Sequence, residues 1–153
     1  MLLTLDLSLN EPGYCIETPH GVDSGFWKPP KGYSPYAKIE YNLQVILKLC
    51  KEFKIKLVGI ESASFRSKSA STNILAEQQG VIKYELKKLG IDITEIPITR
   101  IKKYITGKGN AKKIDVINAL RENHNILKTN DNECDAIAAY LYLKSLDAVA
   151  TLE

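Results

Sequence analysis

Leucines alternate with polar residues near the start of the chain, and this pattern predicts strands. Residues 2–9 mix the two classes as a buried strand does, residues 10–13 (Asn-Glu-Pro-Gly) form a turn, and residues 14–16 resume the extended pattern. These segments predict a hairpin. A third strand is expected near residues 25–28, before a proline- and glycine-rich loop.

Apolar spacing changes to three and four residues between positions 38 and 53, which predicts a helix. The apolar positions are Leu43, Ile46, Leu47, Cys50 and Phe53. A short β-branched run at 55–60 then predicts a strand that leads directly into Glu61, and the serine-rich residues 62–71 predict a loop. Thr72 is expected to cap a helix that extends to about residue 89, with Gly90 just beyond its end.

One more strand and three helices are predicted in the rest of the chain. Apolar and polar residues alternate over 91–98, and a short helix over 99–104 is broken by Gly107 and Gly109. Asn110 is expected to cap a helix over 111–122, and a last helix is expected over 132–146. Strands followed by alternating helices and strands favour a single α/β domain over residues 1–153, with a mixed sheet covered by helices.

The composition is that of an ordinary globular protein. With 153 residues, 44% hydrophobic and 25% charged, the chain suits one core and argues against disorder, collagen or coiled coil. No apolar run approaches the ~20 residues of a membrane span, and the early carboxylate Asp6 argues against a signal peptide. Three cysteines without a C-x-x-C pair are expected to be reduced, buried thiols of a cytoplasmic protein.

The net charge of +3 is too small to identify a nucleic-acid partner, but its distribution is uneven. Residues 96–114 contain no acidic residue and hold six cations: Arg100, Lys102, Lys103, Lys108, Lys112 and Lys113. A solvated face is the ordinary interpretation of such a cluster, and a surface that contacts phosphates is the more specific one.

Carboxylates occur where a charge is costly. Asp6 lies in the first apolar strand, Glu61 ends a second, and Asp131 and Asp135 are four residues apart at the start of the last helix. Singly, Asp6 could end a strand, Glu61 could pair with a lysine, and Asp131 could cap the helix. Together they would repel one another without a cation, and an oxygen-only site favours Mg²⁺ or Mn²⁺. Two such ions can catalyse phosphodiester hydrolysis.

Other chemistries fit less well. His20 and His124 have no candidate ligand near them in the sequence, which disfavours a zinc site. The chain has no G-x-S-x-G motif, and residues 107–109 (Gly-Lys-Gly) lack the full phosphate-loop pattern of an NTPase.

Several segments together resemble the RuvC family, Holliday-junction resolvases of the ribonuclease H-like superfamily with short relatives in phages. The matching segments are the strand ending at Asp6, the strand end at Glu61, residues 78–81 (Gln-Gln-Gly-Val), residues 101–113 and residues 135–138 (Asp-Ala-Ile-Ala). The most specific part is the K-x-x-x-x-G-x-G-x-A-x-K pattern from Lys102 to Lys113.

The resemblance implies a ribonuclease H-like α/β fold, a mixed five-stranded sheet flanked by helices. It also implies a homodimeric endonuclease that uses Mg²⁺, with Mn²⁺ as a substitute, to resolve four-way DNA junctions and leave 5′-phosphates and 3′-hydroxyls. Asp6, Glu61 and Asp135 match the metal-binding carboxylates. Lys102 and Lys113 match basic residues that the family places near the scissile phosphate or the DNA, and of these two we expect Lys113 to be catalytic. The expected DNA-contacting residues are Phe65, Arg66, Lys68, Lys102, Lys103, Lys108, Lys112 and Lys113.

One departure from the family concerns the fourth metal ligand. Family members usually carry Asp or His three residues before the last carboxylate, where this chain has Asn132. We expect Asp131 to supply the ligand; coordination by the Asn132 amide oxygen and a weaker metal site are the alternatives. Phe65 could instead pack against the sheet. Two functional alternatives stay open: a relaxed nuclease for branched DNA in general, and a non-catalytic junction-binding protein.

Overall fold

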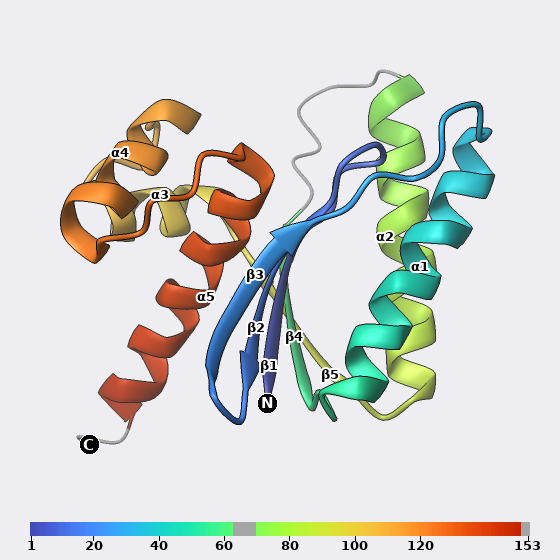
Figure 1. Ribbon diagram of the computed structural model, residues 1–153, viewed down its shortest axis with the longest axis horizontal. Helices are drawn as coiled ribbons and strands as arrows, with labels where there is room; N and C mark the ends of the chain where they lie inside the picture. Colours follow the sequence, from blue (N-terminus) through green and yellow to red (C-terminus); the bar gives the residue numbers. More distant parts are fainter. Residues whose placement is uncertain (63–69, 151–153) are drawn as a thin grey trace.

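The computed structural model describes residues 1–62 and 70–150, built around a mixed sheet with the strand order β3-β2-β1-β4-β5 (Figure 1). The strands are β1 (Leu2–Asp6), β2 (Gly13–Thr18), β3 (Gly21–Phe26), β4 (Leu57–Glu61) and β5 (Asp92–Ile96). β2 is antiparallel to both β1 and β3, whereas β1, β4 and β5 are parallel. The predicted mixed five-stranded sheet is therefore confirmed.

Helices cover both faces of the sheet. They are α1 (Pro35–Glu52), α2 (Ala70–Lys88), α3 (Ile98–Thr106), α4 (Lys113–His124) and α5 (Asp131–Ala150). Figure 1 shows α1 and α2 on one side and α3, α4 and α5 on the other. One apolar cluster packs Leu3, Ile46 and Ile82 on the first side, and a second packs Leu2 and Leu120 on the other. The alternation of β1 side chains between these clusters explains its nearly continuous apolar sequence.

α5 lies directly on the sheet because two glycines and a buried hydroxyl allow it. A Cβ on Gly13 would come within 2.1 Å of the Asn132 carbonyl oxygen, and one on Gly59 within 2.7 Å of Leu143 Cδ1. The fully buried Thr4 donates a hydrogen bond from Oγ1 to the carbonyl of Ala136, at 2.8 Å. These contacts hold α5 against β1, β2 and β4.

Two of the predicted elements begin earlier than expected. β3 begins at Gly21 instead of near residue 25, because it is defined by antiparallel pairing with β2 and not by a buried apolar face. α2 begins at Ala70, so Thr72 lies inside the helix and is not its cap.

The last two helix starts also differ from the prediction. α4 begins at Lys113, where the Asp115 carboxylate accepts a hydrogen bond from the Lys112 amide at 2.8 Å, so Asn110 is not its cap. α5 begins at Asp131, and the Asn130 side chain accepts the Glu133 amide at 2.9 Å. In both cases a polar side chain satisfies an amide that has no partner within its helix: the amide of the cap residue Lys112 for α4, and that of Glu133 in the first turn of α5.

All three cysteines, Cys15, Cys50 and Cys134, are buried free thiols, as the sequence predicts. Among the described residues, no helix combines the length and the apolar character that crossing a membrane requires.

Candidate active site

Asp6 and Glu61 lie at neighbouring strand ends. β1 and β4 are parallel, and Leu5 pairs in register with Ile60, so each carboxylate follows directly at the same edge of the sheet. The Gln79 side chain on α2 donates a hydrogen bond to the Glu61 carbonyl at 3.0 Å and holds this strand end. Both carboxylates are half-buried. The structure therefore places the two strand-end acids, Asp6 and Glu61, close to each other, as expected from the sequence.

α5 brings the other two acids to this edge. It begins at the end of the sheet where β1 ends (Figure 1), and Asp131 and Asp135 lie on its first turns. The Asp135 side chain is only 14% exposed, whereas that of Asp131 is 45% exposed. Asp135 therefore belongs to the interior of the cluster and Asp131 to its rim.

Lys113, the first residue of α4, inserts its ammonium group beside these acids. Its Nζ lies 2.8 Å from Asp131 Oδ2 and 3.9 Å from Asp135 Oδ2. Burial alone would lower the pKa of Lys113, but the hydrogen bond to Asp131 and the attraction of Asp135 and Asp6 raise it above its ordinary value. Lys113 is therefore the counter-charge of the cluster.

Proton affinities are unusual within the cluster. Burial, and then repulsion from Asp135, raises the pKa of Asp6 to about 7. Burial, and then repulsion from Asp6, raises the pKa of Glu61 to about 7. Burial also raises the pKa of Asp135, whereas the hydrogen bond from Lys113 holds the pKa of Asp131 below its usual range. The fold thus holds three acids where their negative charge is poorly solvated.

The carboxylate oxygens of the acid cluster are suitable ligands for a hard cation. In this structure, however, the four carboxylates are too far apart to bind the same ion together. Within residues 1–62 and 70–150, no three His, Cys, Asp or Glu side chains are close enough to hold one metal ion. A shared ion requires the side chains of Asp6, Glu61 and Asp135 to turn toward one another. Ionised carboxylates that are poorly solvated are appropriate ligands for Mg²⁺ or Mn²⁺, because the charge of the cation compensates their negative charge.

The predicted basic residues divide into two groups. Lys102 is half-buried on α3, and its charge lowers the pKa of both Glu61 and Asp135, so it belongs to the site. Lys103, Lys108 and Lys112 are exposed. The other predicted DNA-contacting residues, Phe65, Arg66 and Lys68, lie outside the described residues.

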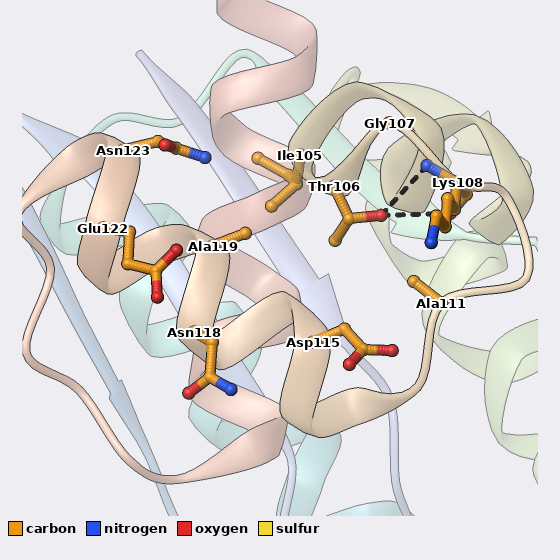
Figure 2. A pocket seen from close by; sticks show the side chains of 10 residues that line it. All are labelled: Ile105, Thr106, Gly107, Lys108, Ala111, Asp115, Asn118, Ala119, Glu122 and Asn123. Atoms are coloured by element: carbon orange, nitrogen blue, oxygen red, sulfur yellow. Dashed lines mark hydrogen bonds between the residues drawn. The ribbon is translucent and has the colours of Figure 1, made fainter.

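A turn between α3 and α4 contains the glycines of the basic segment. Figure 2 shows the Thr106 hydroxyl bonded to the main chain of Lys108, at 3.1 Å, and Gly107 adopts φ +80° at the end of α3. A polar cavity of about 620 Å³ lies beside this turn. Its lining residues are Ile105, Thr106, Gly107, Lys108, Ala111, Asp115, Asn118, Ala119, Glu122 and Asn123. Since none of the four clustered acids lines this cavity, the acid cluster is a separate site.

Asn132, the residue at the family's usual ligand position, is engaged elsewhere. Its amide nitrogen donates to the main-chain carbonyl of Glu11 at 2.6 Å. The neighbouring Glu133 is buried and bonded to Ser24 and Lys128, both at 2.8 Å. Sequence reasoning missed Glu11 as a partner of α5, because a contact across more than a hundred residues leaves no local signal in the chain.

Known proteins resemble this chain in both sequence and fold. The profile of the family described as "Crossover junction endodeoxyribonuclease RuvC" matches residues 20–141. The chain belongs to the RuvC family. RuvC of Anaplasma marginale (strain Florida) is 31% identical over 138 residues, which cover 88% of this chain and 80% of that protein. RuvC of Synechococcus sp. (strain CC9902) is 26% identical over 147 residues, covering 92% and 95% of the two chains.

Solved RuvC structures share the fold. Thermus thermophilus RuvC in complex with Holliday junction substrate superposes with a TM-score of 0.75 at 14% identity, covering 92% of this chain and 90% of that one. The ribonuclease H-like α/β fold implied by the resemblance, with its mixed five-stranded sheet flanked by helices, is therefore confirmed.

Proposed function

We propose that this protein is a structure-selective DNA endonuclease that resolves four-way (Holliday) junctions by metal-dependent phosphodiester hydrolysis. The proposal rests on the proximity of Asp6, Glu61 and Asp135 at one end of the sheet, where Asp6 and Asp135 raise the pKa of Glu61, in a chain that belongs to the RuvC family. The solved RuvC complex with Holliday junction substrate supports the choice of substrate.

Asp6, Glu61 and Asp135 are the proposed metal ligands, and Asp131 at the rim is the proposed fourth. The proposed ion is Mg²⁺, which Mn²⁺ can replace, because the donor set consists of carboxylate oxygens. When bound, it supplies Lewis-acid activation of water and stabilisation of negative charge on phosphate oxygens.

Lys113 and Lys102 stabilise the negative charge that develops on the scissile phosphate. Lys113 is 55% exposed at its side chain, so it can turn from Asp131 to a phosphate without unfolding α4. Lys103, Lys108 and Lys112 extend the positive surface away from the acids and contact phosphates of the junction arms. Phe65 is a proposed contact for unstacked bases at the junction centre, and Arg66 and Lys68 are proposed DNA contacts.

A symmetric junction has two strands to cut, so we propose that two copies of the chain act as a two-fold dimer. Junction shape supplies most of the selectivity, since phosphate contacts carry little sequence information.

A panel of synthetic DNAs tests the function. Wild-type protein is mixed with four-way, three-way, flap and linear duplex substrates of equal arm sequence, with Mg²⁺ or with EDTA. Paired cuts in the four-way junction that need Mg²⁺ are expected. Equal cleavage of every branched substrate would indicate the relaxed nuclease, and tight junction binding without cleavage would indicate the non-catalytic binder.

A further inference from the structure

The amide, the carbonyl and both carboxylate oxygens of Glu11 each form a hydrogen bond or an ion pair. Their partners belong to different parts of the site. The Glu11 amide donates to Ser8 Oγ at 2.8 Å, and its carbonyl accepts from Asn132 Nδ2 at 2.6 Å. Of the carboxylate oxygens, Oε1 accepts from Asn130 Nδ2 and Oε2 pairs with Lys28, each at 2.5 Å. Since the Glu11 side chain is 22% exposed, these bonds are partly shielded from water.

Through Ser8, Glu11 is connected to the main chain of Asp6. The Ser8 amide donates to the Asp6 carbonyl at 3.2 Å, so Ser8 joins Glu11 to the residue that carries the first carboxylate. The loop of residues 7–12 is also attached to the α1–α2 layer. The fully buried Asn42 and Gln78 donate to the carbonyls of Leu9, at 3.2 Å, and Ser8, at 3.4 Å. The loop is thereby anchored on a rigid support.

Through Asn130 and Asn132, Glu11 is also connected to the start of α5. Asn130 and Asn132 flank Asp131, and both donate to Glu11. The close approach of Gly13 to the Asn132 carbonyl leaves no space for α5 to slide along β2. Asp135 lies one helical turn farther along α5, so the position of this first turn sets the position of both acids.

We propose that the Glu11 carboxylate is a positioning group of the metal site: through its bond to Asn130, added to the main-chain bonds of Glu11 to Ser8 and Asn132, it holds Asp131 and Asp135 in register with Asp6. The role rests on the proposed function, because it presumes that these acids bind a metal ion. In the described part of the structure, Glu11 forms no hydrogen bond with any of the four acids, and it acts through Ser8, Asn130 and Asn132.

Direct Mn²⁺ binding by the 153-residue chain tests this role without DNA. Free Mn²⁺ is counted by electron paramagnetic resonance during a titration of wild type, Glu11→Ala and Glu11→Gln. Residues that orient metal ligands typically change metal affinity by roughly 10–100-fold, so Glu11→Ala is expected to raise the Mn²⁺ dissociation constant by at least about tenfold. Cleavage by Glu11→Ala should recover toward wild type at saturating Mn²⁺.

Glu11→Gln separates positioning from charge. Its side-chain oxygen can still accept from Asn130, but the negative charge is lost. Affinity near that of wild type supports positioning, whereas a loss equal to that of Glu11→Ala overturns it, because the effect would then be long-range attraction of the cation.

Glu17→Ala is the matched control, because Glu17 joins β2 to the far end of α5 through Lys144 at 3.3 Å. It removes a comparable link without touching the first turn, so Mn²⁺ affinity should not change. Equal losses for Glu11→Ala and Glu17→Ala would mean that general loosening of α5 is the cause, and the positioning role is then wrong. If Glu11→Ala binds Mn²⁺ like wild type, that role alone is wrong. If wild type binds no Mn²⁺, the proposed metal site fails as well.

Discussion

The ammonium group of Lys113 lies 2.8 Å from Oδ2 of Asp131 and so joins the first residue of α4 to the first residue of α5. The same ammonium group is attracted by Asp135 and Asp6. Lys113 therefore has two possible partners during the reaction, the acids of its own chain and a phosphate of the DNA.

Lys113→Ala should impair the chemical step more than junction binding. Removing one preorganised charge that faces developing negative charge typically costs roughly 10²–10³-fold in rate. The measurement is single-turnover cleavage at saturating protein, beside junction affinity, with Lys113→Arg as the charge-retaining comparison. Weaker binding with an unchanged saturated rate would make Lys113 only a docking residue.

Lys108→Ala and Lys112→Ala should behave differently, because both side chains are exposed and, among the described residues, neither forms an ion pair with the four acids. Each lost phosphate contact should reduce the slope of log affinity against log salt by about 0.9, with little change in the saturated cleavage rate. Lys51→Ala, exposed on α1 in the opposite layer, is the control and should leave the slope unchanged. A wild-type slope in both Lys108→Ala and Lys112→Ala would remove these residues from the DNA surface.

The fourth metal ligand can be assigned by comparing substitutions at the neighbouring residues Asp131 and Asn132. Asp131→Asn should reduce cleavage far more than Asn132→Ala, because Asp131 faces Lys113 and the acid cluster, whereas the Asn132 amide bonds to Glu11. Loss of that neutral hydrogen bond costs roughly 1 kcal/mol in stability. Cleavage rates across a Mg²⁺ titration decide between them. The reverse ranking would assign the ligand to Asn132, and equal small effects would indicate that neither residue is the ligand.

Stability without metal should decrease as pH rises. Asp6 and Glu61 have pKa values of about 7 in the folded protein, whereas such groups titrate near about 4 when unfolded. Between about pH 4 and pH 7 the folded state therefore keeps protons that the unfolded state releases, so the free energy of unfolding falls through that window.

Asp6→Asn removes one of these groups and should raise the melting temperature in EDTA at pH 8 more than at pH 5. A change of 1 kcal/mol corresponds to roughly 2–4 °C for a chain of this size. Thermal melts at both pH values measure the difference. An equal or lower melting temperature for Asp6→Asn at pH 8 would show that the acids are not held under strain.

The sheet and its helices could be predicted because each element has its own local pattern. The apolar runs before Asp6 and Glu61 marked two strand ends, and parallel pairing of those strands then placed both acids together. β3 was harder because it is a mostly exposed edge strand, whose start depends on pairing with β2 and not on apolar side chains.

Helix caps and the supports of the site could not be predicted reliably. Asn110 had an appropriate side chain for a cap, but the Asp115 carboxylate bonds to the Lys112 amide and fixes the start of α4 two residues farther on. The bonds of Glu11 to Asn130 and Asn132 depend on how α5 lies against β2, which no sequence window contains. Side-chain chemistry suggested the acids, and three-dimensional packing determined what holds them.

We propose that Asp6 and its neighbouring acids hold the metal ion needed to cleave a four-way junction, while basic residues elsewhere bind the DNA. The most direct measurement is single-turnover cleavage of a synthetic four-way junction in Mg²⁺ by wild type and Asp6→Asn, each with its junction affinity. We predict Mg²⁺-dependent cleavage by wild type, no detectable cleavage by Asp6→Asn, and nearly equal affinities. Near-normal turnover by Asp6→Asn would contradict the assignment of the site.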